Sequence, residues 1–478
     1  MARGKEYIKN KGQVFTPTWI VKLMLDFGNY NTSQILKKHV IDNSCGNGAF
    51  LMEIVHRYCT IARNNNIPDK EIAKDLQIYI HGIEIDTNTY QECIHNLNNL
   101  IKEFNLHSVN WDILNADTLT IDRYNNKMDY VFGNPPYVRV HNLSTEYKLV
   151  KQFSFSQQGM TDLYIVFFEI GFQMLSPIGK MCLITPISWL NSAAGLMLRK
   201  TIFEKHFLSG IIDFEHYQIF NVTTYNIISK FENDKTDTKF EYYHFEEDYK
   251  IVRKQDTLSF DDVLINNKFY IATTEQLSLL RNIRNIKIKN YARVKNGFAT
   301  LADKIFIGDF DFEDCTIDVL KASNGKWSKI IFPYDTNGNP LIHKEFQKHK
   351  RAYKYMLLHK NELSHNSDIK DENLWYLFGR SQAIKDVFND KIAINSIIRD
   401  EDSIKLEFVP TGKGIYSGLY ILTNESFETI REIIISKDFI EYLQLLKNYK
   451  SGGYYTYSSK DLEVYLNFKI AERYGDDR

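Results

Sequence analysis

The sequence predicts an α/β protein with a Rossmann-like, doubly wound first domain and a mixed α+β second domain. Between residues 40 and 58, an apolar segment, a glycine-rich turn and a segment with helical spacing follow one another. Two further apolar segments within the first 140 residues end in polar or acidic side chains. Strands that alternate with helices in this way build a mostly parallel sheet. The 478 residues are also too many for one ordinary core, so two domains are expected.

The composition is typical of a globular protein that does not enter a membrane. Hydrophobic residues make up 44% of the chain and charged residues 25%. No apolar stretch is long enough for a membrane span, and residues 1–5 lead into a polar segment rather than a secretory one. The five cysteines form no CxxC pair, so neither a zinc site nor a disulfide framework is expected. We therefore expect a cytoplasmic protein with no membrane partner and no metal.

The first predicted strand ends at Val40-Ile41-Asp42, and a glycine-rich turn follows it. Gly46 and Gly48 allow the backbone to turn sharply and to approach a ligand closely. Helical spacing then places Leu51, Ile54, Val55 and Tyr58 on one side of a helix. This order is that of the first unit of a doubly wound sheet, whose ligands bind at the carboxyl ends of strands. A tight turn without a ligand is the alternative.

Acidic side chains follow the next two predicted strands. The apolar segment from Ile78 to Asp86 contains Glu84, which at this place can accept hydrogen bonds from both hydroxyls of a ribose. Asp86 is the weaker candidate for that role. Asp117 can accept the amino group of an adenine. Each acid taken alone is equally consistent with a solvent-exposed loop, and only their order along the chain favours a nucleoside ligand.

The segment Asn134-Pro135-Pro136-Tyr137 follows an apolar strand and a glycine. An exocyclic amine on a base is a poor nucleophile because its lone pair is delocalised into the ring. The Asn134 side-chain oxygen and the Pro135 carbonyl can accept its two hydrogens and free that lone pair, while consecutive prolines hold the carbonyls rigid. Tyr137 offers a flat face on which a base can stack. A plain turn at the end of a strand is the alternative.

Together these motifs resemble the TaqI-like, gamma-class adenine-N6 DNA methyltransferases, which use S-adenosyl-L-methionine. The family's amino-terminal element corresponds to Gly12-Gln13-Val14-Phe15-Thr16-Pro17, and its catalytic tetrapeptide to residues 134–137. Asn43 stands where the family usually has proline, which we expect to affect the glycine turn little. The motifs span about residues 10 to 230, and cofactor motifs precede the recognition region as in the gamma class.

The resemblance implies roles for individual residues of this chain. The implied cofactor-binding residues are Thr16, Asp42, Cys45, Gly46, Gly48, Glu84, Ile85, Asp117 and Phe167. The implied catalytic residues are Asn134, Pro135, Pro136, Tyr137 and Phe220, where Phe220, within Ile219-Phe220-Asn221, stacks on the target base opposite the tyrosine. Two of these residues have another interpretation, since Thr16 followed by Pro17 also suits the start of a helix and Phe220 also suits a core.

The sequence pattern changes near residue 245. This change divides the chain into a predicted catalytic domain, residues 1–244, and a predicted DNA target-recognition domain, residues 245–478. The basic segments Leu280–Lys295 and Lys344–Arg351 are candidates for phosphate contacts or solvated faces. Residues 296–303 and 450–462 resemble the family's recognition domain, and Gly452-Gly453 suits a hairpin whose tyrosines we expect to pack. Arg380, Gln382 and Arg399 are unassigned candidates for reading bases.

The expected function is transfer of a methyl group from S-adenosyl-L-methionine to the N6 amino group of an adenine extruded from double-stranded DNA. The expected partners are double-stranded DNA and a cognate restriction endonuclease, because the resemblance implies the modification part of a restriction-modification system. The net charge of −1 weighs only weakly against DNA binding. RNA adenine methylation, protein-glutamine methylation and a fused or partnered nuclease are the alternatives.

Overall fold

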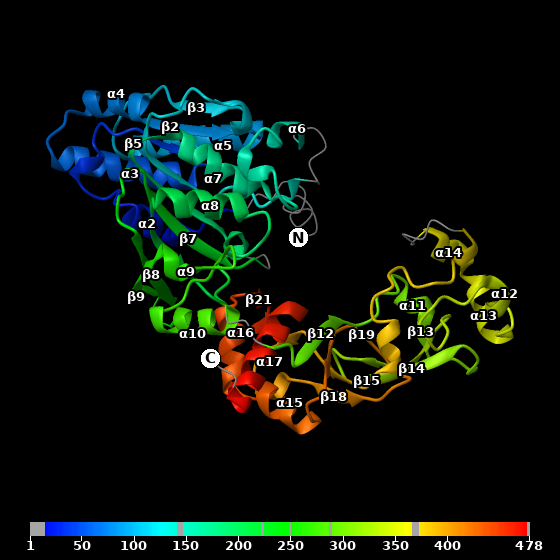
Figure 1. Cartoon of the computed structure of the whole chain (residues 1–478). Coiled ribbons are helices and arrows are strands. Elements are labelled where there is room, and N and C mark those ends of the chain that lie inside the picture. The colour runs from blue at the N-terminus through cyan, green and yellow to red at the C-terminus, as the bar shows by residue number, and fades with distance from the viewer. Residues whose placement is uncertain are drawn as a thin grey trace. The chain divides into compact units, whose positions relative to one another are not determined.

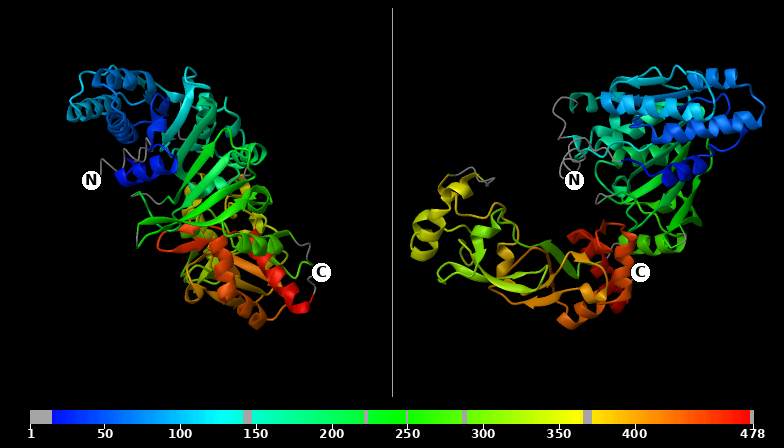
Figure 2. Two further views of the ribbon diagram at one scale, coloured as in Figure 1. Left: turned by 90° about the vertical axis from the view of Figure 1, so that its left-hand side faces the viewer. Right: turned by 180° about the vertical axis from the view of Figure 1, so that it is seen from behind.

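A computed structural model describes residues 15–140, 147–220, 224–248, 250–285, 289–365 and 372–475. The chain divides into two compact units, Met1–Ser278 and Leu279–Arg478. Figure 1 shows the elements of both units along the chain, and Figure 2 shows each unit from two further sides.

A nine-stranded sheet forms the centre of the first unit, with the strand order β3-β2-β1-β4-β5-β7-β6-β8-β9 (Figure 1). Strands β3 to β5 are parallel, and β7 runs antiparallel to β5 and β6. The strands are β1 (Val40–Asp42), β2 (Ile80–Glu84), β3 (Asp112–Asn115), β4 (Met128–Gly133), β5 (Leu175–Pro186), β6 (Leu208–Asp213), β7 (Asn226–Glu232), β8 (Lys239–Glu246) and β9 (Ile251–Ser259). The strand order reverses between β1 and β4, and such a switch point is where doubly wound sheets bind ligands.

Helices cover both faces of this sheet because successive strand residues point to opposite sides. The cluster on one face joins alternate strand residues such as Val40 and Phe132 to α2 (Thr18–Phe27), α3 (Ala49–Asn64), α4 (Asp69–Tyr79) and α5 (Thr87–Glu103). On the other face, a Cβ added at Gly171 would lie 2.4 Å from Met181 Sδ and 3.8 Å from Val131 Cγ1, so α7 (Leu163–Met174) packs closely there. The predicted doubly wound fold is confirmed.

Smaller elements complete the first unit. They are the helices α6 (Tyr147–Val150), α8 (Leu196–Lys205) and α9 (Phe260–Val263) and the first turn of α10 (Thr274–Asn285), together with the hairpin of β10 (Leu264–Ile265) and β11 (Lys268–Phe269). The predicted boundary between residues 244 and 245 falls inside β8, which pairs with β9 from Lys239 to Glu246. The boundary must lie later than predicted, because the sheet continues through β9 and the unit ends at Ser278.

The second unit contains three small sheets, with the strand orders β12-β20-β16-β18, β13-β15-β14-β19 and β17-β22-β21. Its strands are β12 (Ala292–Asn296), β13 (Ile307–Gly308), β14 (Thr316–Lys321), β15 (Lys326–Ile331), β16 (Lys391–Ile394), β17 (Ile397–Ile398), β18 (Leu406–Val409), β19 (Gly414–Tyr416), β20 (Leu419–Thr423), β21 (Tyr449–Lys450) and β22 (Tyr454–Thr456). Its helices are α11 (Asp303–Phe306), α12 (His343–Phe346), α13 (Lys350–Leu358), α14 (Lys360–His365), α15 (Phe427–Ile434), α16 (Lys437–Leu445) and α17 (Ser459–Tyr474).

Local predictions in the second half have mixed outcomes. The hairpin at Gly452-Gly453 is confirmed, since β21 and β22 are antiparallel and both glycines have φ near +78°. Tyr455 and Tyr457 are buried, as packing tyrosines should be. The basic segment from Leu280 begins in helix α10, where Leu280 and Ile283 are buried on an apolar helical face. Residues 286–288 of that segment lie outside the described residues.

None of the helices in the described ranges is long and apolar enough to cross a bilayer.

Candidate active site

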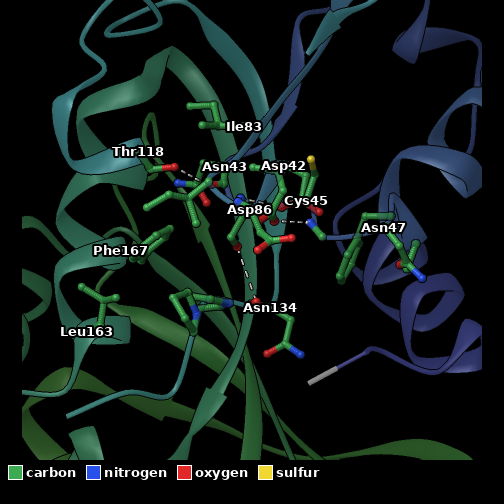
Figure 3. A pocket seen from close by; sticks show the side chains of 18 of the residues that line it. Asp42, Asn43, Cys45, Asn47, Ile83, Asp86, Thr118, Asn134, Leu163 and Phe167 are labelled. Carbon is green, nitrogen blue, oxygen red and sulfur yellow. Dashed lines mark hydrogen bonds between the residues drawn. The ribbon is translucent and has the colours of Figure 1, made fainter. Parts of the chain in front are cut away.

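A pocket of about 560 Å³ lies at the carboxyl ends of β1, β2 and β4. The glycine-rich turn after β1 and the segment 134–138 line it, together with residues of α7. Figure 3 shows Leu163 and Phe167 of α7 on the side opposite Asn47. All nine predicted cofactor-binding residues except Gly48 line this pocket, as do all four residues of the tetrapeptide. The predicted residues are therefore brought together, although their roles remain predictions.

The glycine-rich turn is shaped by two left-handed glycines. Gly46 has φ +54° and Gly48 has φ +90°, conformations that side chains of L-residues rarely adopt. A Cβ at Gly48 would lie 2.8 Å from Cys93 Sγ, so the turn can pack on α5 only without a side chain there. A Cβ at Gly46 would meet no atom within 4 Å, so this backbone faces open space in the pocket. The Cys45 N–H donates to the Ile83 carbonyl at 2.9 Å and ties the turn to β2.

Glu84 holds the turn to the end of β2. Its Oε2 accepts a hydrogen bond from the Gly46 N–H at 2.9 Å, and its Oε1 accepts one from the Asp86 N–H at 2.7 Å. Burial raises the pKa of Glu84 despite these two bonds. Asp86, the weaker candidate, caps helix α5 instead, accepting from the Thr89 N–H and hydroxyl at 3.0 Å each. The two acids therefore have different roles. Glu84 links the turn after β1 to the end of β2, whereas Asp86 caps a helix.

Asp42 is a buried carboxylate at the end of β1, with 1% of its surface exposed. Burial raises its pKa to about 7, the neighbouring Glu84 adds to that rise, and the N–H of Ser44, which donates to Asp42 Oδ1 at 3.0 Å, opposes it. Asp42 therefore changes charge near neutral pH.

The side of the pocket after β3 holds Asp117. One carboxylate oxygen of Asp117 accepts from the Leu119 N–H at 3.0 Å, and the next residue, Thr118, donates through Oγ1 to the Asn43 carbonyl at 2.6 Å (Figure 3). The apolar part of the lining includes Phe167 and Ile85, and Ile85 is 59% exposed.

The tetrapeptide is tied to two other segments at Asn134. Its Nδ2 donates to Thr16 Oγ1 at 3.1 Å, and its carbonyl accepts from the Ser44 hydroxyl at 3.4 Å. The alternative interpretation of Thr16 as a helix cap is wrong, because Pro17 is the N-cap of α2. The first residues of that amino-terminal element, 12–14, lie outside the described residues.

The two predicted stacking aromatics touch at an angle. The ring centroids of Tyr137 and Phe220 are 6.3 Å apart and their planes are inclined by 70°. Phe220 is 4% exposed, belongs to the core cluster on this face of the sheet, and is not among the described residues lining the pocket. In this structure Phe220 is therefore a core aromatic against the edge of Tyr137, and Asn221 beside it lies outside the described residues.

Sequence reasoning missed several residues of the site. Ser44 bonds both Asp42 and Asn134, and its place inside the glycine turn was the available signal. The hydroxyl of Tyr137 donates to the Ile184 carbonyl at 3.1 Å and accepts from Asn226 Nδ2 at 3.0 Å. No motif or spacing points to Asn226, because it lies 89 residues along the chain from Tyr137.

Several basic or polar candidates of the second unit are engaged within the protein. Gln382 Nε2 donates to the Gly297 carbonyl at 2.6 Å, Arg399 Nε donates to Asp400 at 2.7 Å, and Arg351 pairs with Asp311 at 2.6 Å. Arg284 forms a buried ion pair with Asp461 at 2.5 Å. Arg380 is exposed. Within the described part of the chain, no group of three or more His, Cys, Asp or Glu side chains is arranged to hold a metal ion.

Comparison with known proteins matches residues 47–220 to the family model described as Eco57I restriction-modification methylase. The Type II methyltransferase M.BstVI of Geobacillus stearothermophilus is 26% identical over 404 residues, covering 72% of this chain and 71% of the relative. The Type II restriction enzyme and methyltransferase RM.Eco57I of Escherichia coli is 23% identical over 501 residues, covering 82% of this chain and only 50% of the relative.

A solved structure shares the fold. The Type IIL restriction-modification enzyme MmeI, determined in complex with DNA, matches with a TM-score of 0.62 at 14% identity, over 98% of this chain and 68% of that chain. The resemblance predicted from the motifs is confirmed at the level of restriction-modification methyltransferases. Residues 47–220 are therefore similar to an Eco57I-type restriction-modification methylase domain.

Proposed function

We propose that the protein is a DNA methyltransferase that uses S-adenosyl-L-methionine to methylate the N6 amino group of an adenine extruded from double-stranded DNA. One observation carries the proposal: the carboxylate-braced glycine turn and the Asn134–Tyr137 tetrapeptide line a single pocket. A nucleoside site and a pair of acceptors for an amine are then within reach of each other.

The pocket fits the cofactor in size and chemistry. Its volume of about 560 Å³ lies within the range usual for ligand sites. Glu84 lies where a ribose is bound in doubly wound sheets, and the open space at Gly46 admits the ligand close to the backbone. Asp42 adds negative charge that suits a cationic ligand once it is ionised. When bound, S-adenosyl-L-methionine supplies a methyl group on a sulfonium.

Asn134 and Pro135 orient the amine to be methylated. The Asn134 side-chain oxygen is the proposed acceptor for the substrate, and the bond from Nδ2 to Thr16 Oγ1 orients the amide. The Pro135 carbonyl is the second acceptor, and Tyr137 stacks on the base. No strong base is needed, because the methylated ammonium is very acidic. Extruding the base costs a few kcal/mol, and stacking returns about 1–3 kcal/mol per contact.

Stacking on both faces of the base requires Phe220 to turn. A base between two rings needs parallel planes about 7 Å apart, twice the thickness of an aromatic ring. The rings of Tyr137 and Phe220 are inclined by 70°, so they do not form such a slot here. We infer that Phe220 reorients when a base enters, while Tyr137 keeps its place.

The second unit is proposed to recognise the DNA sequence. MmeI, with the same fold over both units, binds DNA in its solved complex. The assignment of residues 279–478 as the target-recognition domain rests on that likeness and on the motifs at residues 296–303 and 450–462. A cognate endonuclease is a further proposal, since RM.Eco57I combines restriction enzyme and methyltransferase in one chain about twice the matched length.

The test is transfer of label from radioactive S-adenosyl-L-methionine to mixed-sequence duplex DNA. We expect N6-methyladenine in the digested DNA, and unchanged activity in excess chelator. Label on RNA or on a polypeptide would instead support one of the alternative substrates. Incubating plasmid with the protein and magnesium reports any nuclease, because cleavage converts supercoiled plasmid to nicked or linear forms.

A further inference from the structure

The hydroxyl of Tyr137 is held from two strands of the sheet. It donates to the Ile184 carbonyl of β5 at 3.1 Å, and the side chain of Asn226 in β7 is 3.0 Å away. Burial raises the pKa of Tyr137 well above its ordinary value, so the hydroxyl keeps its single proton. Because that proton is used on Ile184, the bond with Asn226 must run from the Asn226 amide to the hydroxyl oxygen. The amide group of Asn226 therefore has only one useful orientation.

The need for this arrangement follows from the prolines of the tetrapeptide. Strand β4 ends at Gly133, whose partner in β5 is Leu183, so Ile184 lies one residue beyond the last β4–β5 pair. Pro135 and Pro136 have no N–H with which to continue the ladder. The Tyr137 hydroxyl supplies a donor to the Ile184 carbonyl instead. The two prolines thus make the segment rigid and also leave the Ile184 carbonyl for the Tyr137 hydroxyl to bind.

Asn226 is a polar residue at a buried position, where its side-chain oxygen lowers the stability of the fold. It is the first residue of β7 and is 1% exposed. Its Oδ1 is buried, and among the described residues no hydrogen-bond donor reaches it. A buried acceptor without a donor is destabilising, and an apolar side chain would fill the same space without that cost. A leucine of similar size would lack the amide N–H that Asn226 donates to the Tyr137 hydroxyl.

We propose that Asn226 is a positioning residue, which with the Ile184 carbonyl fixes the Tyr137 ring before the target base arrives. This inference rests on the proposed function, because it assigns the fixed ring a base to receive. Phe220 has no polar atom to anchor it and touches Tyr137 edge-on, so it is the ring that can turn. Tyr164, whose hydroxyl is 2.9 Å from Ser188 Oγ, also packs against the Tyr137 ring, with the ring centroids 6.2 Å apart and the planes inclined by 78°. The base site therefore combines one anchored ring and one movable ring.

A double-mutant cycle tests the inference. Tyr137→Phe keeps the ring and removes the hydroxyl, whereas Asn226→Leu keeps the volume and removes the amide donor. Single-turnover methyl transfer to duplex DNA is measured for each variant and for the pair, with saturating cofactor. We expect each single variant to lower the rate about three- to tenfold, and the pair to be no slower than the slower single variant. Ser229→Ala on β7 is the control, since its buried hydroxyl has no hydrogen-bond partner among the described residues, and its rate should not change.

Two further readouts separate positioning from a merely structural role. The gain in fluorescence of 2-aminopurine at the target position should fall in both single variants, while the affinity for S-adenosyl-L-methionine stays within twofold of the wild type. Should Asn226→Leu fail to fold, Asn226→Ser replaces it, because serine is too short to reach the hydroxyl.

The outcomes are distinguishable. Rate losses that multiply in the double variant would overturn the inference, as would unchanged rates accompanied by a lower unfolding midpoint. A wild-type protein that transfers no methyl group to DNA would refute the proposed function and this inference with it. Independent rate effects in an active wild-type protein would refute the inference alone.

Discussion

Carboxyl groups lie at both ends of the parallel strands in the first unit, but their pKa values are shifted in opposite directions at the two ends. At the carboxyl ends, Asp42 and Glu84 are held by backbone N–H groups, and among the described residues no lysine, arginine or histidine forms an ion pair with either. Both carboxyls have raised pKa values. At the amino ends, Asp112 of β3 faces His81 of β2.

The amino-terminal end is a compensated network. His81 Nδ1 is 2.6 Å from Asp112 Oδ2, Arg123 also pairs with Asp112, and the Tyr124 hydroxyl donates to it at 3.1 Å. Burial alone would raise the pKa of Asp112, but the bonds from His81 and Arg123 outweigh burial and lower it to about 2. On its other side, His81 Nε2 is 2.8 Å from His39 Nδ1.

Buried charge destabilises this sheet mainly at the carboxyl ends of its strands. Charges at the amino ends are neutralised by neighbours, so they stabilise the fold. Charges at the carboxyl ends have only amides as partners, so their compensation is left to a ligand. Perturbed carboxyl groups of the second kind are typical of functional sites.

The largest expected effect is that of Asn134→Ala at the carboxyl end. Removing the side-chain acceptor should lower the methyl-transfer rate at least about a hundredfold, as losses of oriented transition-state contacts do. Affinity for S-adenosyl-L-methionine should stay nearly unchanged, because the proposed partner of the amide oxygen is the substrate amine. Transfer assays and isothermal titration measure the two quantities. A large loss of cofactor affinity would show that Asn134 acts on the cofactor instead.

The second prediction concerns the pH dependence of cofactor affinity. With a pKa of about 7, Asp42 is mostly protonated at pH 6 and mostly ionised at pH 8. If the cationic cofactor requires the ionised form, affinity should rise about tenfold between these values. Asp42→Asn keeps an oxygen for the Ser44 N–H and should abolish the rise. Titration of the cofactor's own amino group appears in both proteins, and identical profiles for the two would refute the prediction.

How far the sequence reveals this site depends on how local each contact is. Asp42 and Glu84 end strands β1 and β2, Gly46 lies in the turn after β1, and Asn134 directly follows β4, so strand order alone brings them to one edge. The capping role of Asp86 was also legible, since Thr89 follows at the spacing of a helix cap.

Other parts of the structure depend on register between distant segments. The contact of Asn226 with Tyr137 arises from the antiparallel pairing of β5 and β7, which residue spacing does not encode. The inclined ring of Phe220 depends on packing in the core. The domain boundary was missed because β8 and β9 carry many charged side chains, so they look like the start of a different domain although they extend the first sheet.

The third prediction is that removing a carboxyl group changes the free energy of unfolding in opposite directions at the two ends of the sheet. The folded-state pKa of Asp42 is raised, so stability falls as pH rises from about 4 to about 7, and Asp42→Asn should stabilise the protein by up to about 4 kcal/mol at pH 8. The pKa of Asp112 is lowered, so its contribution is present above about pH 4, and Asp112→Asn should cost about 1 kcal/mol after allowance for solvent screening. Denaturant unfolding at pH 8 measures both. The same sign for both variants would remove the contrast between the ends.

The smallest expected effect belongs to His39 at the amino-terminal end. Burial lowers the pKa of His39, the neighbouring His81 lowers it further, and Asp129 and Asp112 oppose that change while Lys127 adds to it. A histidine whose folded-state pKa lies below its ordinary value near 6.5 binds fewer protons when folded, so its contribution to stability should rise with pH up to that value and level off above it.

Asp42 and Glu84 change stability in the opposite direction over part of the same range, so the histidine effect has to be isolated. We therefore compare Asp42→Asn with the double variant Asp42→Asn, His39→Phe between pH 5 and pH 7.5. Phenylalanine keeps a planar ring, and the His39 backbone N–H still donates to Asp129 at 2.9 Å. The difference in unfolding midpoint between the two proteins should shrink or reverse toward low pH, because protonation penalises only the protein that retains His39. A constant difference would mean that the amino-terminal network is insensitive to His39 protonation, and that the compensation there comes from Asp112, His81 and Arg123 alone.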